Sequence, residues 1–168
     1  MEQLCDDLKM HTPRIVGLWD QAVDAEPWLL PREHARSDFV PDLVHALAET
    51  TLCDRPTRES VLALAATAAR HAEARAHAGV DHSRVVLEYY LLRNALWAYF
   101  DEKAESEEAL GAILYLDVAI SMATRAALLG YYRGELETRG RWEGALERLV
   151  DETPLMWTRR QRPARPRV

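Results

Sequence analysis

The sequence predicts an all-α protein, a bundle of five to six helices. Residues that favour helix, chiefly Ala, Leu, Glu and Arg, dominate the composition, while the 168 residues include only seven glycines and eight prolines. Apolar positions recur at helical spacing, and no segment shows the alternation of a strand. A chain of this length is expected to form one domain with a full core. Both a plain bundle and a globin-like packing of the helices fit the pattern.

Five main helices are expected, over residues 2–25, 38–53, 57–78, 82–103 and 106–138. Pro13 lies near the middle of the first one and should kink or break it, because proline lacks the amide hydrogen that a helix interior needs. The two-proline segment EPWLLPRE links this helix to the second. Ser37 and Asp38 are candidate capping residues there, and Pro41 suits a first helical turn.

Caps and a glycine turn define the third and fourth helices. Thr57 is expected to cap the third helix, although Ser60 stands where a full capping box has Glu or Gln. Gly79 should end this helix, and Asp81 or Ser83 should open the next one.

Residues 1–138 are expected to form the helical domain, and residues 139–168 a short linker helix followed by a disordered basic tail. Gly140 precedes the amphipathic segment RWEGALERLVDE, and the chain ends in RRQRPARPRV. The tail carries five arginines, so the net charge of −6 conceals a charge of −11 on residues 1–158. Such an acidic body argues against nucleic-acid binding, which depends on neutralising phosphates.

A cytoplasmic location is expected. The start, MEQLCDDLK, lacks the basic and apolar regions of a signal peptide. The most apolar stretch, residues 109–132, contains Asp117 and Arg125, which favours a buried helix over membrane insertion. Cys5 and Cys53 are far apart and form no CxxC motif, so neither a disulfide framework nor a thiolate zinc site is expected.

Three histidines within residues 71–82 raise the question of a metal site. Side chains share a helix face at spacings of three or four residues. His71 and His77 are six residues apart, which leaves them about 120° apart around the helix. His82, across the glycine turn, and Glu73 do not complete a ligand set, and we expect no metal.

A haem site needs a histidine that faces an apolar cleft, and His71, His45 and His11 are all conceivable ligands. A haem- or small-ligand-binding globin-like protein is therefore the alternative function. No nucleophile motif or glycine-rich phosphate loop is present, so no enzyme, catalytic residue or cofactor is expected.

Two helices are expected to be central to the packing. Apolar residues cover nearly the whole circumference of residues 84–100, which predicts a helix wrapped by its neighbours. The helix at 106–138 carries a seam at alternating three- and four-residue steps, formed by Ile113, Leu116, Ile120, Ala123, Ala127 and Gly130. Its small residues allow close approach of another backbone, either a helix of this chain or the same helix of a second subunit. We expect a homodimer that uses this seam.

Charged residues inside these apolar helices predict an inter-helix polar network. Glu88 and Arg93 are five residues apart, about 140° around the helix, so they cannot pair with each other. An unpaired buried charge is costly. We expect His71 and Arg75, which share a helix face, to contact Glu88, and Arg93 to pair with Asp117. Exposure of several of these side chains to solvent is the other interpretation.

The stretch HAEARAHAGVDHSRVVLEYYLLR resembles a known family at this point. It is similar to the N-terminal sensor domain of RsbRD-type RsbT co-antagonists, which also precedes many bacterial sensor histidine kinases. The matching positions are His71, Arg75, Gly79, Glu88, Tyr89, Leu92 and Arg93. Trp19, residues 41–52 and Asp117 also resemble the family, and the resemblance covers residues 3–138.

The resemblance implies a cytoplasmic, non-catalytic all-α input module, usually dimeric, that serves bacterial stress or two-component signalling. Related stressosome sensors are globin-like without haem. The implied partners are a downstream kinase or a protein of an anti-sigma pathway. No kinase motif is present in the chain, yet residues 145–157 resemble the entry helix and first strand of a PAS domain. The expectation is either a stand-alone sensor or a truncated kinase.

Overall fold

The computed structural model describes residues 2–26, 39–52, 57–101 and 107–153, and this part of the chain contains helices and no strand. The helices are α1 (Glu2–Met10), α2 (Thr12–Ala25), α3 (Phe39–Thr51), α4 (Arg58–His77), α5 (His82–Asp101), α6 (Glu107–Tyr131), α7 (Arg133–Thr138) and α8 (Ala145–Asp151). The predicted all-α bundle is confirmed. In the described part of the chain, eight helices replace the expected five or six, because two of the expected helices are each interrupted at one residue.

Local chemistry explains the break between α1 and α2 and the cap of α4. His11 separates α1 from α2, and Pro13 lies in the first turn of α2, as expected from its missing amide hydrogen. The start of α4 is better capped than expected. The Thr57 hydroxyl accepts from the Ser60 amide at 3.1 Å, and the Ser60 hydroxyl accepts from the Thr57 amide at 3.1 Å. Ser60 therefore completes the capping box in place of Glu or Gln.

The α4–α5 hairpin turns at Gly79, whose φ is +73°. This left-handed conformation is the reason a glycine is needed here. The amide of Val80 donates to the carbonyl of Arg75 at 3.0 Å, which closes the end of α4. The carboxylate of Asp81 then accepts from the amide of Ser83 at 2.9 Å, so Asp81 is the residue that caps α5.

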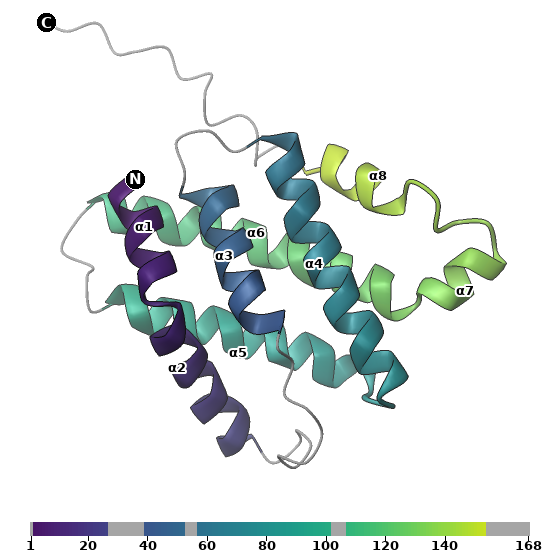
Figure 1. Cartoon of the computed structure of the whole chain (residues 1–168), viewed down its shortest axis with the longest axis horizontal. Coiled ribbons are helices and arrows are strands. Elements are labelled where there is room, and N and C mark those ends of the chain that lie inside the picture. The colour runs from purple at the N-terminus through teal and green to yellow at the C-terminus, as the bar shows by residue number, and fades with distance from the viewer. Residues whose placement is uncertain (1, 27–38, 53–56, 102–106, 154–168) are drawn as a thin grey trace, which may run out of the picture.

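The helices form two layers, with α1–α4 in front of α5 and α6 in the view of Figure 1. The most extensive contact joins α4 and α6. A Cβ added at Gly130 of α6 would overlap the carbonyl oxygen of Ala69 on α4, so the two backbones touch at this point. The small residues of α6 therefore meet a helix of the same chain.

The dimer prediction is wrong for the seam residues themselves. Leu116, Ile120, Ala123 and Ala127 have exposed fractions of 1% or less, Gly130 is buried against Ala69, and Ile113 is partly buried against the core. A heptad-like pattern with small residues identifies a helix face that packs closely, but not the chain that supplies its partner.

The prediction that α5 is wrapped on all sides is also wrong. Val86, Tyr90 and Trp97 are 37%, 53% and 50% exposed. They lie four and seven residues apart and so share one face of the helix. This face of α5 is open to solvent.

The segment after α7 is part of the same core. Ala145, Leu149 and Val150 of α8 are buried, and α8 contacts α4 and α6 (Figure 1). Two hydrogen bonds from the Arg58 guanidinium to the Asp151 carboxylate, at 2.9 and 3.1 Å, join the ends of α4 and α8. The linker helix expected within residues 139–168 is α8, and it packs on the bundle. The predicted first PAS strand and the basic tail lie outside the described residues.

The span Gly111–Tyr131 of α6 is long and apolar enough to cross a membrane by length and composition alone. That evidence is weak, because the core helix of a soluble protein passes the same test. In its most apolar window, 44% of the residues are buried inside the structure.

Candidate functional site

The predicted contact of His71 and Arg75 with Glu88 exists. The Nε2 atom of His71 lies 2.9 Å from Oε2 of Glu88. The Arg75 guanidinium donates from Nε to the same oxygen at 3.3 Å, and its Nη2 donates to Oε1. The side chains of His71 and Glu88 are each 2% exposed, and that of Arg75 is 11% exposed. These three residues form the Glu88 cluster, a buried carboxylate held by two donors.

The α4–α5 hairpin brings the three residues of the Glu88 cluster together. His71 and Arg75 are one turn apart on α4 and so project on one side of it. The turn at Gly79 returns the chain so that Glu88, two turns into α5, faces that side. The hydroxyl of Tyr131 on α6 donates to the carbonyl of Val80 at 2.8 Å, which ties the turn to the next helix.

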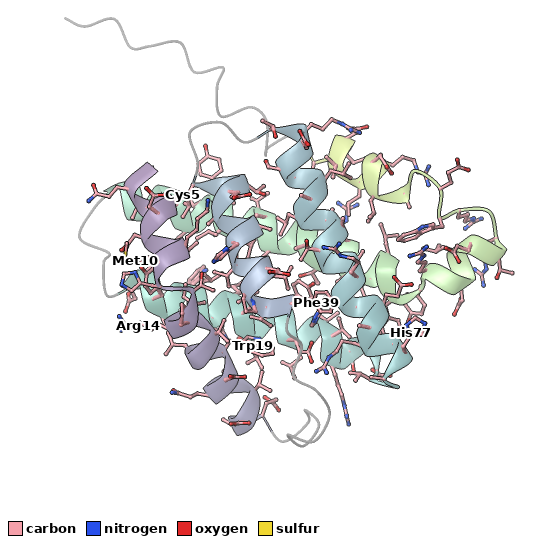
Figure 2. The ribbon with its side chains drawn as sticks, in the orientation of Figure 1. Cys5, Met10, Arg14, Trp19, Phe39 and His77 are labelled. Atoms are coloured by element: carbon pink, nitrogen blue, oxygen red, sulfur yellow. The ribbon has the colours of Figure 1, made fainter. Side chains whose placement is uncertain are left out.

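Trp19 of α2 joins the cluster from a distant part of the chain. Its indole Nε1 donates to the backbone carbonyl of Glu88 at 3.0 Å, across 69 residues of sequence. Figure 2 shows Trp19 on α2 and Phe39 at the start of α3. The rings of Phe39 and Tyr89 both meet the His71 ring edge-on, at 6.2 and 5.8 Å between centroids. The site therefore connects α2, α3, α4 and α5.

The cluster keeps its carboxylate ionised. Burial alone would raise the pKa of Glu88, but hydrogen bonds and positive charge from His71 and Arg75 outweigh it, so the pKa lies below its ordinary value. Next to it, burial and the charge of Glu88 raise the pKa of Tyr89 well above its ordinary value. The hydroxyl of Tyr89 donates to the carbonyl of Ala68 at 3.3 Å. Tyr89 is thus a neutral buried donor that holds α5 against α4.

A small cavity adjoins the cluster. Its volume is about 10 Å³. The lining residues are Trp19, Val40, Leu43, His71, Glu88, Tyr89 and Leu92. A space of this size holds at most one water molecule. A haem ligated by His71 would therefore require α2 or α3 to move away from α5.

The other histidines considered as ligands lie elsewhere. His45 is exposed on α3, and His11 contacts Asp7 and Tyr99. His77 is exposed near the end of α4 (Figure 2), and His82 packs against the rings of Tyr131 and Tyr132. Within residues 2–26, 39–52, 57–101 and 107–153, no three His, Cys, Asp or Glu side chains gather as a metal site would require.

The second predicted pair also exists. Nε of Arg93 on α5 lies 2.8 Å from Oδ1 of Asp117 on α6, and Nη2 of Arg93 donates to the hydroxyl of Ser121 at 3.0 Å. The side chains of Arg93 and Asp117 are 30% and 40% exposed. An ion pair so accessible to water contributes little to stability. This pair lies on the outer side of the α5–α6 contact, apart from the Glu88 cluster.

Trp19 is the member of the site that reasoning from charge and spacing missed as a contact of Glu88. Its resemblance to the family's first helices was the only signal for it. No family model, curated protein or solved structure matches this chain. The resemblance to RsbRD-type sensor domains therefore stays a prediction, and the evidence on function comes from the geometry of the Glu88 cluster.

Proposed function

We propose that this protein is a non-catalytic sensory or regulatory domain of bacterial stress or two-component signalling, located in the cytoplasm and working through helix rearrangement in a dimer. The observation that carries the proposal is the Glu88 cluster. Replacing a buried ion pair with apolar residues of similar size often stabilises a protein, so such a pair is weak evidence for a stabilising role. Its best-attested use is to select one arrangement of helices over others.

The cluster has the energetics of a switch element. Moving α5 relative to α4 would leave the Glu88 carboxylate buried without its partners, at a cost of about 3–5 kcal/mol. Converting a 1:99 equilibrium to 99:1 requires about 5.5 kcal/mol of differential binding. A stimulus that binds one arrangement of α2, α4 and α5 better than another could supply a free energy of this size.

The dimer that we propose uses the open face of α5 and α6. Four large apolar side chains on these two helices are exposed, Val86, Tyr90, Trp97 and Leu114. The Arg93–Asp117 pair lies between α5 and α6 beside them. In a two-fold dimer each subunit offers the same patch. A patch with one cation and one anion is self-complementary, because Arg93 can approach Asp117 of the partner subunit.

Light scattering over a range of concentrations tests this dimer. We expect wild type to be a dimer and Trp97→Glu to be a monomer with an unchanged circular dichroism spectrum, since the indole is half exposed. Met10→Glu is the matched control, because Met10 is an exposed apolar residue at the end of α1, 73% accessible and not one of the four side chains of the proposed patch (Figure 2). It should leave the dimer intact. A wild-type protein that is monomeric at every concentration would contradict the proposal.

A downstream kinase or an anti-sigma-pathway protein is the partner that we propose for the signal. The motion would reach it through α8, which contacts both α4 and α6 near the C-terminal end of the described chain. The alternative function, haem binding, is less well supported because the cavity beside His71 is about 10 Å³. A Soret band in the absorption spectrum of freshly purified protein would favour that alternative.

A further inference from the structure

A second hollow lies between α6 and α8, away from the Glu88 cluster. Its volume is about 360 Å³, within the range of small-molecule sites. The lining residues are Arg125, Leu128, Leu129, Arg141, Ala145, Arg148, Leu149 and Glu152. Leu149 and Ala145 are 4% and 7% exposed, and the two leucines of α6 are partly buried. The hollow therefore has an apolar floor and a rim of arginines.

The rim carries an excess of positive charge on an acidic protein. Three arginines face one carboxylate, that of Glu152, which lies 3.5 Å from Arg125. Arg141 has no ion-pair partner among the described residues. The lining residues together carry a charge of +2, opposite in sign to the net charge of −6 of the whole chain. This arrangement favours an anion.

One of the arginines is held in place before any ligand binds. Nη1 of Arg148 donates to the carbonyl of Glu143 at 2.9 Å, and Nη2 donates to the carbonyl of Arg141 at 3.1 Å. Both acceptors are neutral, so the guanidinium keeps its charge uncompensated. It lies against Gly144, whose φ is +67° and where an added Cβ would be 3.1 Å from Nη1. A fixed donor loses less entropy on binding an anion than a free side chain does.

We propose that this hollow binds a small amphipathic anion, with a carboxylate or phosphate head at the arginines and an alkyl body on the leucines. Arginine guanidinium groups bind both head groups through charge-assisted hydrogen bonds. The chain's own last ten residues are an unsuitable occupant, because they carry five arginines and no acidic residue. The site is independent of the function proposed for the Glu88 cluster.

Isothermal titration of the full chain with octanoate, below its micellar concentration, tests the site. We expect saturable binding at roughly millimolar concentration or below. Arg141→Gln should weaken it about tenfold, the effect of one lost charge-assisted hydrogen bond. Arg139→Gln is the matched control. It removes the same charge two residues earlier in the chain, and the side chain of Arg139 does not line the hollow.

Two further titrations test the charge of the head group. Octyl phosphate should bind as octanoate does, and octylammonium should not bind. Absence of saturable octanoate binding, equal weakening by Arg139→Gln, or equal binding of octylammonium would each overturn the proposal. Arg141 is exposed, so an unchanged circular dichroism spectrum of Arg141→Gln shows that the weakening is not a folding defect.

Discussion

The substitution Glu88→Gln tests the role of the buried cluster with the smallest change of shape. Glutamine keeps the volume of the side chain, so no cavity forms, but it removes the negative charge that faces His71 and Arg75. Removing one partner of a buried ion pair typically costs about 3–5 kcal/mol, because the other charge remains buried. The Arg75 side chain is 11% exposed and can move its guanidinium toward water. We therefore expect a loss of about 2–3 kcal/mol.

Urea unfolding followed by circular dichroism measures this loss, and thermal unfolding provides a second assay. A destabilisation of this size should lower Tm by about 4–12 °C in a domain of 150–250 residues. Glu73→Gln is the matched control, the same chemical change on the neighbouring helix. Glu73 lies 3.2 Å from Arg133 in a pair whose side chains are 29% and 41% exposed. Such accessible pairs contribute about 0–1 kcal/mol. Equal free energies of unfolding for the two variants would refute the reasoning.

Two other predictions concern the charge of Glu88 and the close approach of Gly130 to Ala69. The pKa of Glu88 is lower in the folded state, so the stability that its charge contributes is present above the ordinary glutamate pKa and is lost as pH falls. In urea titrations, the difference in unfolding free energy between wild type and Glu88→Gln should therefore shrink below about pH 4. A difference that stays constant with pH would exclude this linkage. Gly130→Ala should destabilise the fold by about 1–3 kcal/mol or more, because its Cβ would overlap the carbonyl oxygen of Ala69. Gly134→Ala is the control, because a Cβ at Gly134 would meet open space, and it should be neutral or stabilising by about 0.5–1 kcal/mol in the same assay. Comparable losses of stability in both variants would show that the close approach to Ala69 is not the cause.

Much of the polar site could be predicted from spacing. A separation of four residues places His71 and Arg75 on one helix face, and Gly79 marks the reversal that brings Glu88 to them. The angular argument also excluded a contact between Glu88 and Arg93. These inferences succeed because one hairpin contains all the residues, so local geometry decides which side chains meet.

Contacts between distant segments could not be predicted in the same way. The seam around Gly130 indicates close packing, but it meets Ala69, 61 residues away, and its periodicity is the same whether the partner is internal or external. Trp19 reaches the carbonyl of Glu88 across 69 residues. The open face of α5 at Tyr90 and Trp97 was also missed, because large apolar residues all round a helix do not show which of them lack a neighbour.

The central claim is that the Glu88 cluster holds α4 and α5 in one arrangement. Spin labels at Ala63→Cys on α4 and Ala98→Cys on α5 report the distance between the two helices, since both positions are exposed and lie far from the Gly79 turn. Cys5→Ser and Cys53→Ser remove the native thiols.

Pulsed electron paramagnetic resonance on this labelled protein gives the distribution of distances at pH 7. Labelled protein is mixed with an excess of unlabelled protein, so that in the proposed dimer only the distance within one subunit is measured. We expect one narrow distribution with Glu88 present and with the control Glu73→Gln. Glu88→Gln should add a second population or broaden the first, because the charge that selects the arrangement is gone. A distribution in Glu88→Gln that is the same as in wild type would contradict a switch at this cluster.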